Sequence, residues 1–531
     1  MVPRMNAAPS AHTFRRRFLD ELPGDADASR LARPVVGALW SRVMPTAVAN
    51  PSLVAWSRPL AAELGLDAAT MTAADTVRML GGNAVFPGMD PYAANYGGHQ
   101  FGNWAGQLGD GRAIVLGELV RPDGALAELQ LKGAGPTAYS RRGDGRAVLR
   151  SSIREFLCSE AMHWLGVPTT RALSLVATGD AVVRDMFYDG NAQQEPGAIV
   201  CRVAPSFLRF GNFELPSARG DLALLTTLTD FTLRHFFPQL GGTGLDRYAA
   251  LLREVADRTA RLIAHWQAVG FVHGVMNTDN MSMLGLTIDY GPYGWIDNFD
   301  LGWTPNTTDN HQKRYAFGNQ PGVGLWNVAQ LGEALRPLWQ GSEEVVEEAL
   351  TLYQSTYGEE ATRRFSAKLG LRFDASRGDS DLLQQMFTWL QGEETDMTIF
   401  FRSLSHVVVR DEPTELPAEL QHAFYGTVPP EHLASGLQWL QRWWRRVRSD
   451  STAPTAIAAA MDRANAKFVL RNWLAQDAID AAHVGDFTKV QRLLTVMERP
   501  FDDQPEHAEL AQKRPDWARN KPGCSALSCS S

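Results

Sequence analysis

Cysteine is scarce in this chain: 4 of its 531 residues are cysteine, and no two of them form a Cys-x-x-Cys pair. A disulfide framework and the common zinc-site patterns are therefore excluded. No run of about 18 apolar residues occurs, so the sequence holds no membrane-spanning helix. An excess of positive charge is also missing, because 51 Lys and Arg residues stand against 59 Asp and Glu residues, a formal net charge of −8. That balance argues against a general nucleic-acid binder, which needs a large basic face.

The chain does contain enough apolar sequence for a large folded protein. Hydrophobic residues make up 44% of it and aromatic residues 9%, which rules out general disorder. The length corresponds to roughly three or four domain-sized units. The first ten residues contain no apolar stretch of signal-peptide length, so we expect a cytoplasmic protein in a reducing compartment.

Strand patterns dominate the second hundred residues. Two strand-like runs, 113–118 and 127–132, are separated by the turn sequence Pro122-Asp-Gly124, which predicts a β-hairpin. A second hairpin is expected over 172–204, with its turn at Gly179-Asp180.

Helical spacing of apolar residues marks most of the remaining chain. A helix is expected to open at Asn50-Pro51, with its apolar residues at Leu53, Trp56, Leu60 and Leu64. Further helices are expected over 150–166, 221–237, 246–269, 326–340 and 343–366, with a glycine-rich, strand-poor interruption at 270–325. Strands first and helices after predict a two-lobed α+β fold with a cleft between the lobes.

Lys132 ends the second strand-like run, and the helix that follows carries Glu155. In protein kinases, a strand lysine contacts the nucleotide phosphates and a glutamate of the next helix orients it. A lysine suits this role because its compact ammonium group neutralises phosphate charge. Lys132 alone is weak support, because a lysine at a strand end is more often simply exposed to solvent.

A more specific pattern lies further along the chain. His273, Asn280 and Asp289 fall on the His, the metal-binding Asn and the metal-binding Asp of the kinase pattern H-R-D-L-x-x-x-N followed by D-F-G. Amide and carboxylate oxygens are ligands that Mg²⁺ takes. The kinase catalytic Asp is replaced by Val275, which cannot accept a proton, whereas Asp279 offers a carboxylate from another direction. The pattern therefore predicts a kinase-like fold with rearranged transfer chemistry.

Arginines gather in the glycine-rich part of the same region. Arg112 and Arg146 each follow a Gly-Asp-Gly loop, and Arg202 and Arg209 bracket a short segment. Glycine lets backbone N–H groups close on phosphate, and a guanidinium group matches phosphate oxygens two at a time. This concentration predicts a polyphosphate in the cleft.

Taken together, these stretches resemble the selenoprotein O family, protein adenylyltransferases with a pseudokinase fold. The resemblance covers most of the chain. Its strongest carriers are Asn95–Gly102, Gln107–Arg112, Leu129–Thr137, Tyr139–Arg146, Ser151–Glu155, Arg202–Ser206, His273–Asn280 and Ile288–Pro292.

The resemblance implies that ATP is bound in an orientation reversed from that in kinases, so that AMP moves onto Ser, Thr or Tyr hydroxyls of proteins, including the enzyme itself. Asp279 is implied as the general base, Asn280 and Asp289 as ligands of Mg²⁺, with Mn²⁺ as an alternative, and Glu155 as the partner of Lys132. The residues implied to hold ATP are Gly109, Gly111, Arg112, Lys132, Asp144, Gly145, Arg202, Arg209 and Asp289.

Other functions remain open beside AMP transfer. UMP transfer from UTP shares the same phosphate and metal contacts. Phosphoryl transfer to a hydroxyl is an alternative that Val275 disfavours, and a non-catalytic nucleotide-binding scaffold is another. No nucleic-acid or membrane partner is expected.

A pseudokinase organisation divides the chain into five expected segments. These are an N-terminal extension (1–95), an N-lobe that binds phosphates (96–215), a C-lobe with the metal and catalytic loop (216–400), a helical extension (401–500) and a flexible tail (501–531). Family members carry a redox-active cysteine or selenocysteine near the C-terminus, which Cys529 fits. Where some relatives have a partner cysteine, this chain has Tyr293, so the resemblance leaves Cys524 as the expected partner of Cys529.

Overall fold

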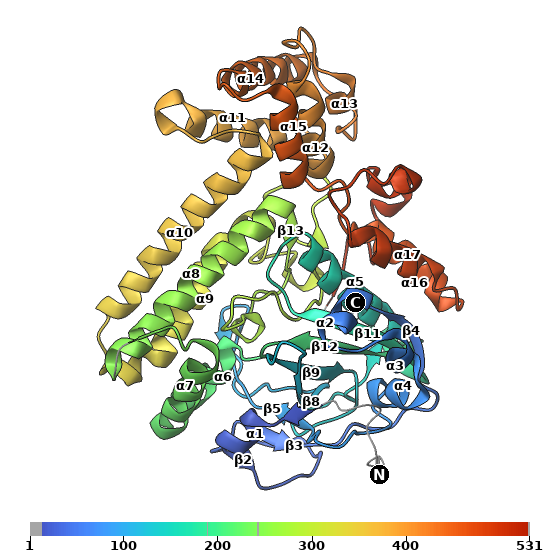
Figure 1. Ribbon diagram of the computed structural model, residues 1–531, viewed down its shortest axis with the longest axis vertical. Coiled ribbons are helices and arrows are strands. Elements are labelled where there is room, and N and C mark those ends of the chain that lie inside the picture. The colour runs from blue at the N-terminus through green and yellow to red at the C-terminus, as the bar shows by residue number, and fades with distance from the viewer. Residues whose placement is uncertain (1–12, 188, 242–243, 529–531) are drawn as a thin grey trace.

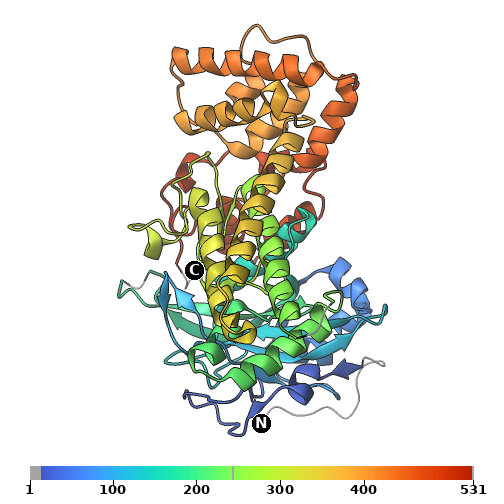
Figure 2. The same ribbon diagram turned by 90° about the vertical axis from the view of Figure 1, so that its left-hand side faces the viewer.

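A computed structural model describes residues 13–187, 189–241 and 244–528. It has an α+β architecture, with a sheet-containing lobe at one end and long helices that lead away from it to a second helical group (Figure 1, Figure 2). Within these ranges, no helix is both long enough and apolar enough to cross a membrane. The predicted two-lobed, kinase-like α+β class with a mostly helical C-terminal part is confirmed.

The N-lobe is built on one sheet. Its strands are β1 (Phe14–Arg15), β2 (Gly24–Asp25), β3 (Trp40–Arg42), β4 (Ser52–Trp56), β5 (Tyr92–Ala94), β8 (Ala113–Val120), β9 (Leu126–Lys132), β10 (Ala147–Val148), β11 (Arg171–Arg184) and β12 (Gln193–Ala204). The main path runs β2-β3-β5-β8-β9-β12-β11-β4, with β1 paired to β8 and β10 paired to β12. Strands β1 to β5 come from the segment expected to be an extension, so its described part belongs to the lobe's own sheet.

Strands β8 and β9 confirm the first predicted hairpin. They pair antiparallel, with Ala113 opposite Lys132 and Val120 opposite Leu126. Gly124 in the turn has a φ of 82°, a left-handed conformation that glycine adopts without steric cost. Ile114 and Val115 pack into different hydrophobic clusters, one on each face of the sheet, which explains why the strand is apolar almost throughout.

The helix predicted from Asn50-Pro51 is wrong. The chain forms β4 over residues 52–56 and turns helical only at α2 (Arg58–Glu63), which the Ser57 side chain caps by accepting the Leu60 N–H at 3.4 Å. Strand β4 pairs with β11 at the sheet edge, where Ala55 lies opposite Leu175. Pairing with a neighbouring strand therefore overrides the helical spacing of the apolar residues.

The turn predicted at Gly179-Asp180 is also wrong. Strand β11 continues to Arg184, and the pairing with β12 shifts register between Ala177 and Ala181, so the glycine lies in a bulge. Gly179 has a φ of 76°, and a Cβ there would lie 2.9 Å from the Asn50 Cβ. Glycine at this position thus allows a bulge inside β11 and close packing of the backbone against Asn50. The chain reverses between the end of β11 and the start of β12.

The remaining helices include the five predicted over 150–166, 221–237, 246–269, 326–340 and 343–366, and several shorter ones that were not predicted. The N-lobe contains α1 (Arg17–Glu21), α2, α3 (Ala68–Thr72), α4 (Ala74–Leu80) and α5 (Leu149–Trp164). The C-lobe contains α6 (Phe210–Ala218), α7 (Leu222–Phe236), α8 (Leu245–Val269), α9 (Gln320–Leu335) and α10 (Glu344–Lys368). Helix α9 begins earlier than the predicted residue 326, because Pro321 favours a helix start in its first turn.

Between α8 and α9 the chain is strand-poor, as expected. It contains the short pair β13 (Phe271–Val272) and β14 (Gly294–Trp295) and the 3₁₀ helix η1 (Thr278–Asn280). A further short pair, β6 (His99–Gln100) and β7 (Asn103–Trp104), reaches from the N-lobe side towards η1, where the His99 N–H donates to the Thr278 hydroxyl at 2.7 Å. The catalytic-loop segment is therefore held by both lobes.

The C-terminal helices form two groups (Figure 1). Helices α11 (Asp379–Gly392), α12 (Met397–Val408), α13 (Ala418–Gln421), α14 (Pro430–Arg448) and α15 (Pro454–Ala464) pack together at the far end of α10. Helices α16 (Asn472–His483) and α17 (Thr488–Met497) return to the N-lobe and pack against α5.

The segment from residue 501 to 528 packs against the protein instead of forming the predicted flexible tail. Leu527 is fully buried, donates its N–H to the Pro305 carbonyl at 2.9 Å and accepts the Thr307 N–H at 2.8 Å. Polar and proline-rich composition suggested mobility, but the apolar Leu527 anchors the segment on the C-lobe loop. Residues 529–531 lie outside the described residues.

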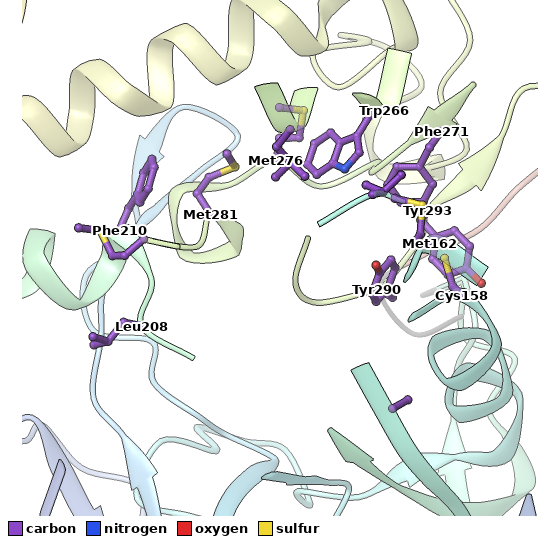
Figure 3. Close-up of a cluster of buried hydrophobic side chains, with 14 of the residues drawn as sticks. Cys158, Met162, Leu208, Phe210, Trp266, Phe271, Met276, Met281, Tyr290 and Tyr293 are labelled. Carbon is purple, nitrogen blue, oxygen red and sulfur yellow. The ribbon is translucent and has the colours of Figure 1, made fainter. Parts of the chain in front are cut away.

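A continuous apolar cluster joins the lobes behind the cleft. Figure 3 shows Cys158 and Met162 of α5 beside Tyr290 and Tyr293, and Trp266 next to Met276. The backbone carbonyl of Arg154 on α5 accepts a hydrogen bond from the Tyr293 hydroxyl at 2.7 Å. Helix α5 is therefore fixed to the segment that follows Asp289.

Candidate active site

A cleft of about 910 Å³ lies between the lobes. Its lining includes every residue that was predicted to hold ATP or metal or to act as the base: Gly109, Gly111, Arg112, Lys132, Asp144, Gly145, Arg202, Arg209, Asp279, Asn280 and Asp289. Eight Lys or Arg residues line it against four Asp residues, a formal charge of 8 − 4 = +4 in a protein whose net charge is −8. Such a local excess of positive charge favours a polyanionic ligand.

The predicted pair between Lys132 and Glu155 is present. Lys132 Nζ lies 2.5 Å from Glu155 Oε2, joining the end of β9 to the middle of α5. The other oxygen of Glu155 accepts a hydrogen bond from Arg202 Nε, a residue of β12 that the sequence did not link to this carboxylate. Burial and the nearby Arg202 lower the pKa of Lys132 to about 8. The Glu155 carboxylate thus orients two of the cations that line the cleft, Lys132 and Arg202.

Asp289 lies between two buried arginines. Arg202 Nη2 donates to its Oδ1 at 2.7 Å, and Arg209 Nη1 donates to its Oδ2. Although burial acts in the opposite direction, Arg209 and Arg202 hold the pKa of Asp289 well below its usual range. Asp289 has a φ of 58°, which Asp and Asn adopt more readily than most residues. It is therefore an anion with a fixed orientation.

Asp279 is the predicted base; it lies in η1 and is 8% exposed. Its Oδ2 accepts a long hydrogen bond from Gln100 Nε2 at 3.4 Å, and its Oδ1 has no hydrogen-bond partner among the described residues. Burial raises the pKa of Asp279 to about 7, and Arg209 counteracts part of that rise. A carboxyl group with a pKa near neutrality is suited to proton transfer.

Gly98 allows the β6–β7 pair to approach the base. A Cβ at Gly98 would lie 2.9 Å from the Asp279 Cβ and 3.0 Å from its Oδ1. The next residue, His99, is hydrogen-bonded to Thr278, and the Phe101 N–H donates to Asn277 Oδ1 at 3.2 Å. These contacts, which the sequence did not reveal, fix the loop that carries Asp279.

Asn280 fits the predicted role of metal ligand. Its Nδ2 donates to the Val275 carbonyl at 2.9 Å, which orients the amide and leaves Oδ1 available. Asn280 and Asp289 line the same cleft, and the carboxylate oxygens of Asp289 can each accept a further interaction. Amide and carboxylate oxygens are the hard donors that Mg²⁺ prefers, so this donor set suits the ion when phosphate oxygens complete its shell.

Packing explains the glycines of the two Gly-Asp-Gly loops. A Cβ at Gly109 would lie 2.4 Å from the Tyr139 ring, and a Cβ at Gly145 would lie 2.2 Å from the Gly135 backbone. Asp144 is exposed and pairs with Arg184, whose Nη2 lies 2.6 Å from its Oδ1. The loops thus meet at the rim of the cleft.

Several cleft residues were missed by the sequence analysis. Asp110 is buried and accepts hydrogen bonds from the Ala94 N–H and the Tyr96 hydroxyl, both at 3.2 Å. The Arg209 guanidinium lies over the Tyr96 ring at 4.8 Å. Asp110 belongs to a loop that was singled out for its glycines and arginine, whereas Tyr96 and Gln100 lie in the motif Asn95–Gly102, to which no site role was assigned.

His273 has a structural role beside the cleft. It is buried, its Nε2 lies 2.9 Å from the Ile288 carbonyl oxygen, and its ring stacks on Trp266. It thereby ties the segment before Val275 to the segment before Asp289. Val275 lines the cleft, so the kinase base position carries no proton acceptor.

The proposed redox pair is only partly described. Cys524 is buried, and burial raises the pKa of its thiol to about 11, which disfavours the reactive thiolate. Cys529 lies outside the described residues. Pairing between Cys524 and Cys529 therefore stays a prediction.

The arrangement of the lobes, the pair between Lys132 and Glu155 and the cationic cleft define a kinase-like protein. It differs from a kinase in having Val275 at the position of the catalytic Asp. A family model described as protein adenylyltransferase SelO matches residues 34–498. The chain therefore belongs to the SelO family, the selenoprotein O family that the motifs resemble.

Curated relatives agree with this assignment. The chain is 57% identical to "Protein nucleotidyltransferase YdiU" of Azoarcus sp. (strain BH72), with 98% of this chain and 99% of that protein covered. It is also 57% identical to the protein of the same name from Xanthomonas axonopodis pv. citri (strain 306), again with 98% and 99% covered. The predicted enzyme class, a nucleotidyltransferase, is thereby confirmed.

Among solved structures, the chain is similar to ROP2 from Toxoplasma gondii, described as a virulence factor with a protein-kinase fold and no enzymatic activity. The similarity covers 50% of this chain and 85% of that one at 12% identity, with a TM-score of 0.23. Because this score is low, the kinase-like description rests on the lobes and the cleft themselves.

Proposed function

We propose that this protein transfers AMP from ATP to Ser, Thr or Tyr hydroxyls of proteins, itself included, with Asp279 as the general base. The observation that carries this proposal is the pairing of a cationic cleft with a displaced base. Asp279, whose pKa is raised to about 7, shares that cleft with Lys132, Arg202 and Arg209, while Val275 occupies the kinase base position.

The proposed reaction is an attack on the α-phosphorus of ATP. The acceptor hydroxyl oxygen forms a bond to that phosphorus, the bond to the bridging oxygen breaks, and pyrophosphate leaves. The hydroxyl proton passes to Asp279. Arg202, Arg209 and Lys132 stabilise the negative charge that develops on the phosphoryl oxygens and on pyrophosphate.

Magnesium is the proposed cofactor, held by Asn280 and Asp289, and manganese has the same donor preference. When bound, the ion neutralises phosphate charge. Arg202 and Arg209 both contact the Asp289 carboxylate, and we expect the phosphates of ATP to take over part of these arginine contacts on binding. Glu155 keeps Lys132 and Arg202 in position throughout.

Labelled nucleotides test the proposal directly. Purified protein is incubated with Mg²⁺ and ATP that is labelled at either the α- or the γ-phosphate, and self-modification is followed on a gel. AMP transfer retains the α-label and loses the γ-label, whereas a kinase retains the γ-label. α-Labelled UTP in a parallel reaction shows whether UMP is the preferred group.

Asp279→Asn separates catalysis from binding. The amide keeps the shape of the side chain but accepts no proton, so we expect the α-label to disappear while ATP binding persists. Asp411→Asn, an exposed position outside the cleft, is the matched control and should label like the wild type. Full labelling of the Asp279→Asn protein would contradict the assignment of the base.

A further inference from the structure

A second cavity, of about 390 Å³, lies at the junction of α5, α8, α10, α12 and α15 and shares no lining residue with the ATP cleft. Basic or hydrogen-bonding side chains line one part of it, including His265, Arg364, Lys368 and Arg463. None of the described residues that line it is Asp or Glu. The size is within the range of small-molecule sites.

Lys368 is the unusual residue of this cavity. This residue lies at the end of α10 and is 7% exposed, yet its ammonium group has neither a carboxylate nor a hydrogen-bond acceptor in the described part of the chain. Its Nζ lies over the Phe401 ring, 4.5 Å from the ring centre. Burial without an anionic partner lowers the pKa of Lys368 to about 7. Buried lysines are ordinarily paired, so an anion is the missing group.

Two further polar atoms at this cavity have no hydrogen-bond partner among the described residues. They are the indole Nε1 of Trp164, an N–H that can only donate, and Nδ1 of His265. Burial lowers the pKa of His265 to about 3, so its ring is neutral and can carry a proton on either nitrogen. Buried donors without acceptors cost free energy, and an oxyanion accepts from several donors at once.

The carboxylate of Glu360 does not neutralise the cavity. Glu360 lies 2.6 Å from Arg363 Nη2 and 2.8 Å from Arg364 Nε, and Arg261 Nη1 lies 3.8 Å away. Arg261 has a closer carboxylate of its own, because its Nε lies 2.8 Å from Asp257 Oδ2. Glu360 is therefore shared mainly by Arg363 and Arg364, so positive charge remains in excess before Lys368 is counted.

Helix-end capping does not account for Lys368 either. A lysine in a last turn often interacts with free carbonyl groups. Here the Leu371 N–H donates to the Ser366 carbonyl at 2.9 Å, and Asn465 Nδ2 donates to the Lys368 carbonyl at 2.8 Å.

We infer that this cavity binds a small organic anion, a carboxylate or phosphate monoester on an apolar body, with its oxyanion beside Lys368 and Trp164. The apolar body is indicated by the remaining wall, which includes Leu165, Val269, Val469 and Phe501. An inorganic anion alone would leave this wall in contact with water. The inference concerns a site outside the nucleotide cleft and does not depend on the proposed AMP transfer.

Fluorinated probes test the site on the full-length protein by ¹⁹F NMR titration. The probes are 4-fluorophenyl phosphate and 4-fluorobenzoate, with 4-fluorobenzyl alcohol as the neutral analogue. We expect at least one anionic probe to bind with a Kd on the order of 1 mM or tighter, and the alcohol to bind at least about tenfold more weakly. Competition by inorganic phosphate measures the contribution of the apolar body, because phosphate should displace the probe only weakly.

Two methionine variants assign the binding to one of the two cavities. Lys368→Met removes the unpaired charge at nearly constant length and should abolish probe binding, while its melting temperature stays the same or rises because a buried unpaired charge is lost. Lys132→Met removes a cation of the ATP cleft and should leave probe binding unchanged.

Three outcomes would overturn the inference. They are no binding of either anionic probe, equal binding of the neutral alcohol, and loss of binding in Lys132→Met but not in Lys368→Met. If inorganic phosphate competes with the probe as strongly as the probe competes with itself, the ligand does not need an apolar body, and that part of the inference would be wrong.

Discussion

At the scale of single residues, Asp289 is the acid that contacts two of the arginines of the cleft. Its carboxylate accepts hydrogen bonds from Arg202 and Arg209, which are both buried. Neutralising Asp289 therefore leaves Arg209 without its closest anion, whereas Arg202 keeps Glu155. Asp289, which the resemblance assigns to ATP and metal binding, thus also holds two buried cations in place.

Asp289→Asn should accordingly lower the melting temperature of the ligand-free protein and abolish nucleotide transfer. Asparagine tolerates the φ of 58°, so the change removes charge without adding backbone strain. Breaking a buried ion pair costs up to about 3–5 kcal/mol, and the shared arrangement should keep the loss below that. Differential scanning fluorimetry measures the shift.

Tripolyphosphate is the diagnostic ligand for this variant. Because it supplies negative charge to Arg202 and Arg209, it should recover more of the melting temperature in Asp289→Asn than in Asp246→Asn, an exposed control in the first turn of α8. Equal melting temperatures for wild type and Asp289→Asn would refute the idea that Asp289 stabilises the two arginines.

Much of the candidate site could be predicted from residue patterns, and the reason is local. Lys132, Asn280 and Asp289 occupy kinase spacings because each sits in a short motif with fixed geometry. The roles of Tyr96 and Gln100 could not be assigned, although both lie in the motif Asn95–Gly102, since these roles arise from tertiary contacts with Arg209 and Asp279 that no local spacing encodes.

At the scale of elements, the β8–β9 hairpin contains an unusual pair of acids. Glu118 and Glu128 lie directly opposite each other in the antiparallel register, and both are buried. Arg17 Nε donates to Glu118 at 2.9 Å, which leaves Glu128 the less compensated of the two. Burial and the neighbouring Glu118 raise the pKa of Glu128 to about 8.

The sign of the resulting pH dependence follows from proton linkage. Between the ordinary glutamate pKa of 4.5 and the folded-state pKa of about 8, the folded protein keeps a proton that the unfolded chain releases. The free energy of unfolding therefore falls as pH rises through this window. Glu128 contributes most to stability at low pH and least above pH 8.

Glu128→Gln should remove this contribution to the pH dependence. Glutamine keeps the hydrogen-bonding shape but has no proton to lose, so the variant should be more stable than wild type at pH 8 by up to a few kcal/mol and similar to it near pH 5. Melting temperatures across pH 5–8.5 measure the difference. The exposed Glu347→Gln serves as control, and a pH profile in Glu128→Gln parallel to that of the wild type would show that Glu128 titrates normally.

Elements were predictable where local pattern and tertiary environment agree. The β8–β9 hairpin has a turn sequence between two apolar runs, and α5, α7, α8 and α10 have long periodic stretches. Strand β4 and the bulge at Gly179 were not predictable. Each is determined by a partner distant in sequence, β11 for the strand and Asn50 for the glycine.

At the scale of the whole molecule, the C-terminal helices reach back to the N-lobe. Helix α17 packs against α5, and Gln491 Nε2 donates to the Val54 carbonyl of β4 at 3.1 Å. Val490 and Leu493 of α17 belong to the same buried cluster as Phe156 of α5. In Figure 1, α16 and α17 lie beside α5 on the face away from the helices of the C-lobe. Helix α5 is thus held from both sides.

This arrangement makes the position of Glu155 depend on α17. Helix α5 carries Glu155, which orients both Lys132 and Arg202. Leu493→Ala removes buried apolar contact from the outer side of α5, and we expect it to lower stability by about 2–4 kcal/mol. Because α5 is then less firmly held, amide hydrogen exchange should rise in residues 150–164 more than in the β8–β9 hairpin, and transfer activity should fall.

Thr495→Ala on the exposed face of α17 provides the matched control, since it changes the same helix without touching the shared cluster. It should leave exchange in α5 and transfer activity close to wild type. The decisive comparison is made well below the melting temperature of the Leu493→Ala protein, where the whole chain stays folded and any change in exchange is local. Increased exchange confined to α16 and α17, with α5 protected and activity intact, would mean that the C-terminal helices cover the N-lobe without positioning Glu155. Increased exchange in α5 together with lost activity would show that the sheet lobe, its helix and the far end of the chain act as one unit in holding the cleft.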